Sequence, residues 1–187
     1  IRNKMINKNL LILGHSGFIG QNFLRSLKIS KNIYLISRKK INYDKEYQYD
    51  IFSNFKWFNL IKNNSTIIFL AFDNNLYKLE KDKSYLKRVN NFCEAFKKFI
   101  DKKKIKVSII FTSTVTIYGL TKKNKIIDED FKDNPSSNYD KSKNFIEKNF
   151  IKYSKSKLIK FVSLRLSNIY GYYGNSSQTN RGFLNKL

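Results

Sequence analysis

Runs of consecutive apolar residues alternate along the chain with longer stretches in which apolar residues recur at helical spacing. The runs, which predict buried strands, lie at Leu10–Leu13, Ile33–Ile36, Tyr47–Tyr49, Thr66–Ala71, Val107–Phe111 and Phe161–Leu164. The stretches, which predict helices, lie at Phe18–Leu27, Lys83–Asp101 and Tyr139–Tyr153. Apolar strands separated by helices indicate a parallel sheet buried on both faces, so the pattern predicts an α/β protein with a doubly wound parallel sheet.

Composition and charge bear on the partners of the protein and leave the prediction of an α/β fold unchanged. The 187 residues include 37 lysines and arginines against 14 acidic residues, a formal net charge of +23. Of these cations 31 are lysines, dispersed along a chain that is also rich in asparagine and isoleucine. An A/T-rich coding sequence explains this pattern better than selection for binding a polyanion, so we expect no nucleic-acid partner.

The counts of cysteine and histidine and the hydropathy of the chain bear on disulfides, metal sites and membrane spans. Cys93 is the only cysteine, which excludes an internal disulfide, and with His15 as the only histidine no metal site is expected. No apolar run approaches about 20 residues, the length of a membrane span, and we expect no signal peptide. The sequence therefore predicts a soluble, cytoplasmic protein with no membrane partner.

Three glycines follow the first predicted strand and open the first predicted helix. Gly14, Gly17 and Gly20 have the spacing G-x-x-G-x-x-G. The first permits a tight turn, the second lets the backbone approach a pyrophosphate, and the third lets the helix pack close to the sheet. Because the helix N-terminus then faces the phosphates, the loop predicts a dinucleotide site, with His15 as a loop residue rather than a catalyst. The cofactor-binding residues expected here are Gly14, Ser16, Gly17, Phe18, Ile19 and Gly20.

The end of the second predicted strand bears on the choice of cofactor. A carboxylate there binds the 2′-hydroxyl of NAD, whereas a cation accommodates the 2′-phosphate of NADP. Here Ser37 and Arg38 are followed by two lysines and no acid. The sequence therefore predicts an NAD(P) site in which NADP is slightly favoured over NAD, with contacts from Ser37 and Arg38.

A candidate acid/base pair lies at the start of the helix Tyr139–Tyr153. Tyr139 and Lys143 form the pattern Y-x-x-x-K, and this spacing places both side chains on one face of the helix. A nearby ammonium favours the phenolate and lowers the pKa of a tyrosine. Such a pair can move a hydroxyl proton while a nicotinamide accepts or gives a hydride.

The segment that follows the strand Val107–Phe111 supports the interpretation of Tyr139 and Lys143 as an acid/base pair. It is rich in hydroxyl groups, contains Thr114, and continues into Tyr118-Gly119. Together with the glycine loop and the Tyr139/Lys143 pair, it resembles the extended short-chain dehydrogenase/reductase family, in particular the nucleotide-sugar epimerase/dehydratase branch. The resemblance extends from about Lys8 to Gly174 and implies a Rossmann-like domain over residues 1–174.

The resemblance implies roles for individual residues. Thr114 would bind the reacting hydroxyl or keto oxygen of a nucleotide sugar, Tyr139 would be the acid/base, and Lys143 would hold the nicotinamide ribose. The supporting asparagine of the family corresponds best to Asn90. The remaining implied contacts are those of Asp50, Ile51, Leu70 and Ala71 with the cofactor and that of Asn168 with the diphosphate of the substrate, while Arg165 has a structural role.

Several alternatives stay open at this point. Val115 and Thr116 stand where 4,6-dehydratases of the family carry acidic residues, which favours an NAD(P)-dependent epimerase or a 4-keto reductase. A non-catalytic dinucleotide sensor and a reductase of a small non-nucleotide ketone are the rival interpretations. Residues 175–187 would only begin the substrate-binding region, so we expect cofactor binding with weak or no turnover. The resemblance also leaves open a homodimer formed through the two long helices.

Overall fold

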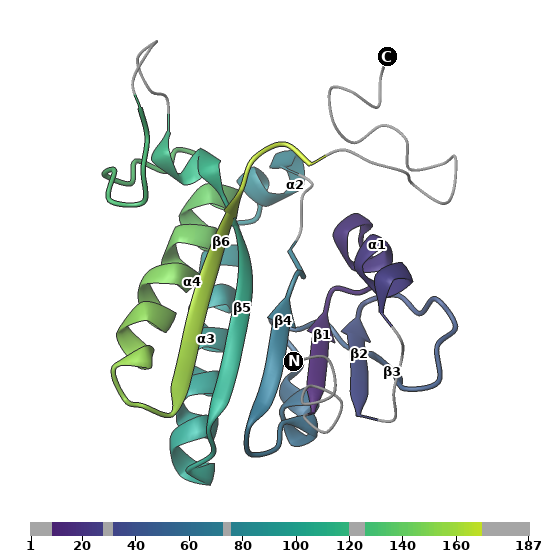
Figure 1. The fold of residues 1–187 in the computed structure, drawn as a ribbon. Helices are drawn as coiled ribbons and strands as arrows, with labels where there is room; N and C mark the ends of the chain where they lie inside the picture. The colour runs from purple at the N-terminus through teal and green to yellow at the C-terminus, as the bar shows by residue number, and fades with distance from the viewer. Residues whose placement is uncertain (1–8, 28–31, 73–75, 120–125, 170–187) are drawn as a thin grey trace.

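The computed structural model of the protein describes residues 9–27, 32–72, 76–119 and 126–169 (Figure 1). Parallel strands form one sheet with the order β3-β2-β1-β4-β5-β6. The strands are β1 (Leu10–Leu13), β2 (Ile33–Ser37), β3 (Glu46–Gln48), β4 (Ser65–Phe69), β5 (Val107–Thr114) and β6 (Ile159–Leu166). The α-helices are α1 (Phe18–Ser26), α2 (Leu76–Lys81), α3 (Tyr85–Lys103) and α4 (Asn138–Ser154), and the 3₁₀ helices are η2 (Phe55–Leu60) and η3 (Val115–Tyr118).

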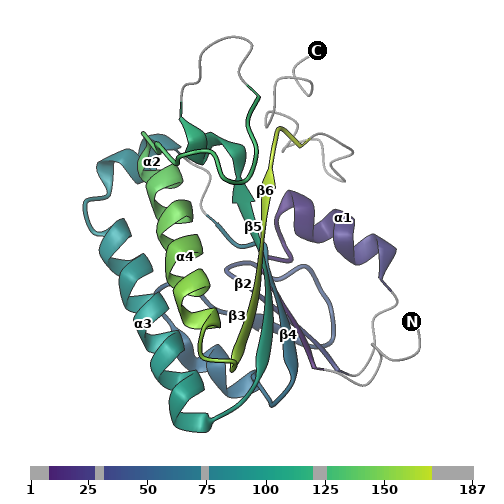
Figure 2. The same cartoon turned by 60° about the vertical axis from the view of Figure 1, so that its left-hand side comes forward.

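Helices cover the two faces of this sheet differently. Figure 2 shows α3 and α4 side by side on one face and α1 on the other. Each expected strand and each of the three expected helices is present, so the prediction of a doubly wound parallel sheet is confirmed. The segment 175–187, expected to begin a second region, lies outside the described residues.

The strand order reverses between β1 and β4, which are neighbours in the sheet although two strands separate them in sequence. Successive strands before this point extend the sheet to one side, and those after it extend the sheet to the other. The loops that leave β1 and β4 therefore diverge, and ligands of open α/β sheets bind in the crevice that such a divergence creates. The architecture places a candidate site at the carboxyl ends of β1, β4 and β5.

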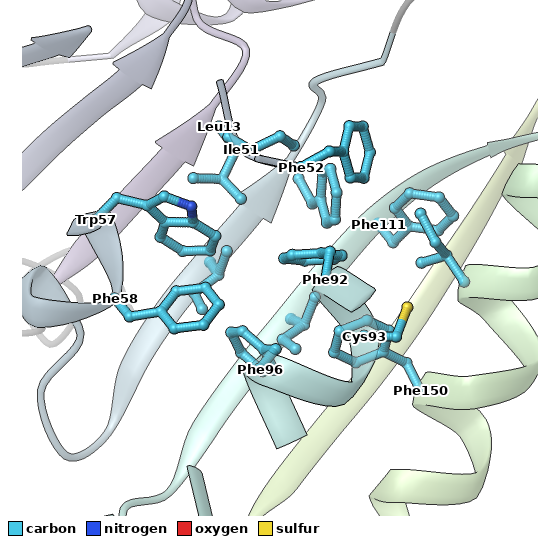
Figure 3. Packing of buried hydrophobic residues seen from close by; sticks show 14 of the residues in the cluster. Leu13, Ile51, Phe52, Trp57, Phe58, Phe92, Cys93, Phe96, Phe111 and Phe150 are labelled. Atoms are coloured by element: carbon cyan, nitrogen blue, oxygen red, sulfur yellow. The ribbon is translucent and has the colours of Figure 1, made fainter. Parts of the chain in front are cut away.

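Helix α3 supplies much of the core because its apolar residues follow helical spacing. Its buried residues are Tyr85, Val89, Phe92, Cys93, Phe96 and Ile100. Figure 3 shows Phe92 at the centre of an aromatic cluster, next to Phe52. The ring centroid of Phe92 lies 5.5 Å from that of Phe52 and 5.6 Å from that of Phe69. A separate, smaller apolar cluster joins α1 to β1 and β2.

Several parts of the fold differ from the expectation: the helices α2, η2 and η3 were not expected, and β5 and β6 are longer than the apolar runs that predicted them. Strand β5 runs to Thr114 rather than ending at Phe111, because the hydroxyl-bearing residues continue to pair with β6 and Thr112 Oγ1 donates to the carbonyl of Phe69 at 3.1 Å. The 3₁₀ helix η2 was not expected, since its aromatic run has no helical period. Asn54 begins η2 by accepting a hydrogen bond from the backbone N–H of Lys56.

Candidate functional site

The glycine loop links β1 to α1 by a turn that has no room for side chains at two positions. Gly14 has φ +87°, and a Cβ there would lie 2.5 Å from the Cα of Ala71, which follows β4. A Cβ on Gly20 would lie 2.5 Å from the carbonyl oxygen of Gly14. The loop is therefore pressed against its own helix and against the chain beyond β4, where Leu70 N–H donates to the carbonyl oxygen of Leu13.

The other side of this loop suits an anion. Gly17 is the N-cap of α1, is exposed, and gives the helix no side-chain cap. The first turn of α1 also contains no acidic residue. A helix N-terminus that no capping side chain occupies carries partial positive charge and N–H donors, which fit the pyrophosphate of a dinucleotide.

The turn after β2 is held by side chains and carries cations on its surface. Ser37 is buried, and its hydroxyl donates to the carbonyl oxygen of Lys39. Gln48 Nε2 donates to the carbonyl oxygen of Arg38 at 3.1 Å. Arg38, Lys39 and Lys40 are exposed at the carboxyl end of β2. The turn thus presents positive charge on a backbone that neighbouring side chains fix.

A buried hydrogen bond joins the glycine loop to the segment that follows β2. His15 is fully buried, and its Nε2 hydrogen-bonds to Oε1 of Glu46, whose side chain is 3% exposed. The same carboxylate accepts backbone N–H groups from Ile41 at 2.6 Å and Asn42 at 3.0 Å. The sequence predicts His15 only as a loop residue, and the separation of 31 residues between the partners leaves no local pattern that would reveal the pair.

The charge on Glu46 is stabilised despite its burial. Burial alone would raise the pKa of this carboxyl, but the hydrogen bonds from His15 and from the backbone of Ile41 and Tyr43 outweigh it and hold the pKa below its usual range. Glu46 is therefore expected to stabilise the folded state as an anion.

Replacing Glu46 by glutamine is expected to lower the free energy of unfolding at neutral pH by about 1–3 kcal/mol, because buried hydrogen bonds to a charge are lost. Since the folded-state pKa is lowered, this stabilisation is complete above the ordinary pKa of a glutamate and is lost as the pH falls through the folded-state value. Urea unfolding at several pH values measures the difference. The exposed Glu129→Gln is the control, and a difference between parent and Glu46→Gln that does not shrink in acid would contradict the assignment.

Tyr139 and Lys143 lie together at the start of α4, facing the end of β5. The Lys143 Nζ donates to the carbonyl oxygen of Thr112 and lies 5.4 Å from the centroid of the Tyr139 ring. Phe72, which follows β4, packs edge-on against Tyr139 with ring centroids 5.3 Å apart, and its own centroid is 4.5 Å from Lys143 Nζ. Phe72 is a site residue that sequence reasoning missed, because its place depends on how β4 and α4 meet.

Burial shifts both of these groups away from their ionised forms. It raises the pKa of Tyr139 to about 12, and the neighbouring charge of Asp140 acts in the same direction. Burial lowers the pKa of Lys143 to about 7, against an opposing effect of Glu147. Tyr139 is therefore a proton donor at neutral pH, and Lys143 is close to its titration point.

Thr114, at the end of β5, belongs to a set of hydroxyl groups arranged around a carboxylate. Its Oγ1 lies 2.8 Å from Thr116 Oγ1, and the Thr116 hydroxyl donates to Oδ1 of Asp140. Ser137 donates to Oδ2 of Asp140 at 2.6 Å and caps α4 by accepting the N–H of the same residue. The Ser137-x-x-Asp140 spacing is a local helix-capping signal that could have located the start of α4 from the sequence.

The other predicted residues are more dispersed. Asn90, on α3, donates a hydrogen bond to Glu94 of the same helix at 3.0 Å. Asp50 accepts the N–H of Phe52 at 3.0 Å, next to the buried Ile51. Asn168 is exposed beyond the carboxyl end of β6.

Arg165 was expected to have a structural role, and its contacts agree with this. Its guanidinium, on β6, pairs with Glu147 of α4 at 2.9 Å and with Asp133 at 3.3 Å. It also lies 4.8 Å from the ring centroid of Tyr118. Burial opposes the charge, but the hydrogen bond to Glu147 raises the pKa of Arg165 above its usual range. The residue holds the edge strand to α4.

Two features are absent from the described residues. None of their helices combines the length and hydropathy that crossing a membrane requires. No group of three or more histidine, cysteine, aspartate or glutamate side chains in these same segments is arranged to hold a metal ion.

Comparisons with known proteins agree with the fold described above. The model of the NAD dependent epimerase/dehydratase family matches residues 10–187, whereas no curated protein matches the chain. A UDP-N-acetylglucosamine 4-epimerase from Methanobrevibacter ruminantium M1, solved with UDP-N-acetylmuramic acid, has 18% identity and a TM-score of 0.77, covering 96% of this chain and 61% of its own.

Two other solved structures are similar over comparable lengths. The UDP-glucose 4-epimerase of Thermus thermophilus in complex with NAD has 23% identity and a TM-score of 0.67, covering 89% of this chain and 57% of its own. RMD from Pseudomonas aeruginosa, complexed with NADPH, has 17% identity and a TM-score of 0.70, covering 92% and 58%. At such identities the likeness shows the fold, and the chain spans little more than half of each of these proteins.

Proposed function

The chain belongs to the NAD dependent epimerase/dehydratase family, and from this membership we propose that it binds NAD(P) and acts on a nucleotide sugar as an epimerase or a 4-keto reductase. The observation that carries the proposal is that the uncapped N-terminus of α1 lies at the carboxyl end of β1 and the pair Tyr139 and Lys143 lies at the carboxyl end of β5, with β4 between these two strands. We assign residues 1–174 to the cofactor-binding domain and residues 175–187 to the start of the substrate-binding region.

Within this proposal each residue has a separate task. The glycine loop binds the pyrophosphate, and Lys143 holds the ribose of the cofactor while its charge favours the Tyr139 phenolate. Thr114 binds the reacting oxygen of the sugar, and Tyr139 exchanges a proton with that oxygen. The bound nicotinamide supplies hydride transfer at the adjacent carbon. Phe72 covers Tyr139 and Lys143 from the side of β4.

An epimerase or reductase is favoured over a 4,6-dehydratase by the residues after Thr114. Elimination of water from the sugar requires a further acid/base at this point of the site, whereas Val115 has no titratable group and Thr116 donates its proton to Asp140. The structure of RMD with NADPH and that of the Thermus thermophilus epimerase with NAD belong to the same fold and carry different cofactors. For this chain the cations of the turn after β2 favour NADP.

Cofactor binding and turnover test the proposal separately. Titration with NADH and NADPH, followed by the change in nicotinamide fluorescence, is expected to give saturable binding with the tighter constant for NADPH. Incubation with UDP-sugars distinguishes the two activities, since an epimerase interconverts sugars without net use of cofactor and a reductase consumes NADPH. A protein that binds neither dinucleotide would overturn the proposal.

Replacing Arg38 by alanine is expected to weaken NADPH binding about tenfold and to leave NADH binding nearly unchanged, because a guanidinium contact to the 2′-phosphate is lost. The control is Arg25→Ala, which removes an exposed arginine from the last turn of α1, away from the glycine loop. Equal losses of affinity for NADH and NADPH would show instead that Arg38 attracts both dinucleotides through its charge and makes no specific contact with the 2′-phosphate.

A further inference from the structure

Asp140 is a buried carboxylate directly after Tyr139, and both of its oxygens accept hydrogen bonds from hydroxyl groups. It is 6% exposed. Oδ1 accepts the proton of Thr116, and Oδ2 accepts that of Ser137 at 2.6 Å. An ionised carboxylate only accepts hydrogen bonds, so the hydroxyl groups of Thr116 and Ser137 must be the donors.

Counting protons fixes the direction of the next hydrogen bond. A threonine hydroxyl carries a single proton, and that of Thr116 is used by Asp140. In the 2.8 Å contact between Thr114 Oγ1 and Thr116 Oγ1 the donor must therefore be Thr114. Thr114 Oγ1 also accepts the backbone N–H of Thr116 at 3.2 Å. Its proton and one lone pair are thus used within the protein, and one lone pair is left.

We propose that Asp140 is a positioning residue that orders the chain Thr114→Thr116→Asp140, so that Thr114 faces a bound sugar only as a hydrogen-bond acceptor. This inference rests on the proposed function and deepens it. Thr114 then recognises the hydroxyl form of the reacting carbon, which has a proton to donate, and offers nothing to the keto form. The proton that a keto oxygen needs comes from Tyr139 alone, so donor and acceptor roles are divided between two residues.

The order of this hydrogen-bond chain depends on the charge of residue 140. In Asp140→Asn the amide can donate to Thr116, which frees the Thr116 proton to point to Thr114 and lets Thr114 donate to a ligand. Thr116→Val removes the acceptor of Thr114 while keeping the shape of the side chain. Thr116 is exposed, so this second variant is expected to fold even if a change at the buried Asp140 does not.

Neutron diffraction from deuterium-exchanged crystals of the parent protein tests the proton order without any assay of activity. The expected result is a deuteron on Thr114 Oγ1 that points to Thr116 Oγ1, and a deuteron on Thr116 that points to Asp140. A deuteron of Thr116 directed to Thr114 would overturn the proposal. The same result decides the question if the parent protein turns over no nucleotide sugar, which would count against the proposed function alone.

Kinetics of the parent, Asp140→Asn, Thr116→Val and the double variant test the role in the reaction. Each single change is expected to lower kcat about tenfold, with the affinity for NADPH unchanged, and the double variant is expected to fall no further than the worse single variant. The control is Asp101→Asn, at an exposed aspartate of α3. Losses that multiply in the double variant, or an unchanged kcat in Asp140→Asn, would contradict the assignment.

Discussion

Replacing Tyr139 by phenylalanine is expected to lower the turnover of a nucleotide sugar by about 10²–10⁴-fold, the usual contribution of a positioned acid/base. Only the phenolic hydroxyl is lost, since the phenyl ring can keep its edge-on contact with Phe72. The affinity for NADPH is therefore expected to stay the same, and the loss is expected in kcat. Initial rates at saturating substrate and a fluorescence titration of cofactor measure the two quantities.

The control for this variant is Tyr153→Phe on the same helix. Its hydroxyl contacts Asn149 at 3.2 Å and lies towards the opposite end of α4 from Tyr139, so its removal is expected to leave turnover unchanged. Turnover that survives in Tyr139→Phe would remove the tyrosine from the reaction. If the parent shows no turnover and both variants bind cofactor equally well, the chain is better described as a dinucleotide-binding protein without catalysis.

The pKa values of Tyr139 and Lys143 bear on how the rate of this reaction depends on pH. Lys143, with a pKa of about 7, loses its charge as the pH rises through neutrality. Its ammonium form is the one that favours the Tyr139 phenolate, whereas burial raises the pKa of Tyr139 to about 12. The two groups are close enough to titrate as a coupled pair, so a pH–rate profile reports on both together.

Much of the fold follows from local patterns. The apolar runs locate the strands because a strand buried on both faces has no polar alternation, and the helical spacing of Val89, Phe92 and Phe96 locates α3. The pattern failed where burial did not depend on apolar side chains. Thr112 and Thr114 are buried through their hydroxyl groups, so the extension of β5 past Phe111 could not be predicted from hydropathy.

The candidate site likewise combines features that local sequence patterns reveal with contacts between elements that are distant in sequence. The glycine spacing and the pair Tyr139 and Lys143 are local, so the sequence reveals them directly. The pair His15–Glu46 and the contact of Phe72 with α4 join elements that are distant in sequence, and only the order of the sheet brings them together. Residues proposed to bind ligands are thus visible in the sequence, whereas several that position them become visible only in three dimensions.

Replacing Phe92 by alanine is expected to lower the free energy of unfolding by about 3–5 kcal/mol, because truncating a buried aromatic leaves a cavity that its neighbours cannot fill. Phe92 is 1% exposed, and its ring centroid lies within 6.3 Å of those of Phe52, Phe69 and Trp57. Such a loss is a large part of the stability of an ordinary domain, about 5–15 kcal/mol. Urea unfolding followed by circular dichroism measures it.

A matched control lies about two turns further along α3. Phe99 is only partly buried and meets the ring of Phe58 at 5.3 Å, so Phe99→Ala is expected to cost less than half as much. If Phe92→Ala does not fold, Phe92→Leu keeps most of the volume and is expected to give a smaller loss that can still be measured. Equal losses at positions 92 and 99 would contradict this account, because the cost would then follow from the helix rather than from the aromatic cluster that joins α3 to the sheet.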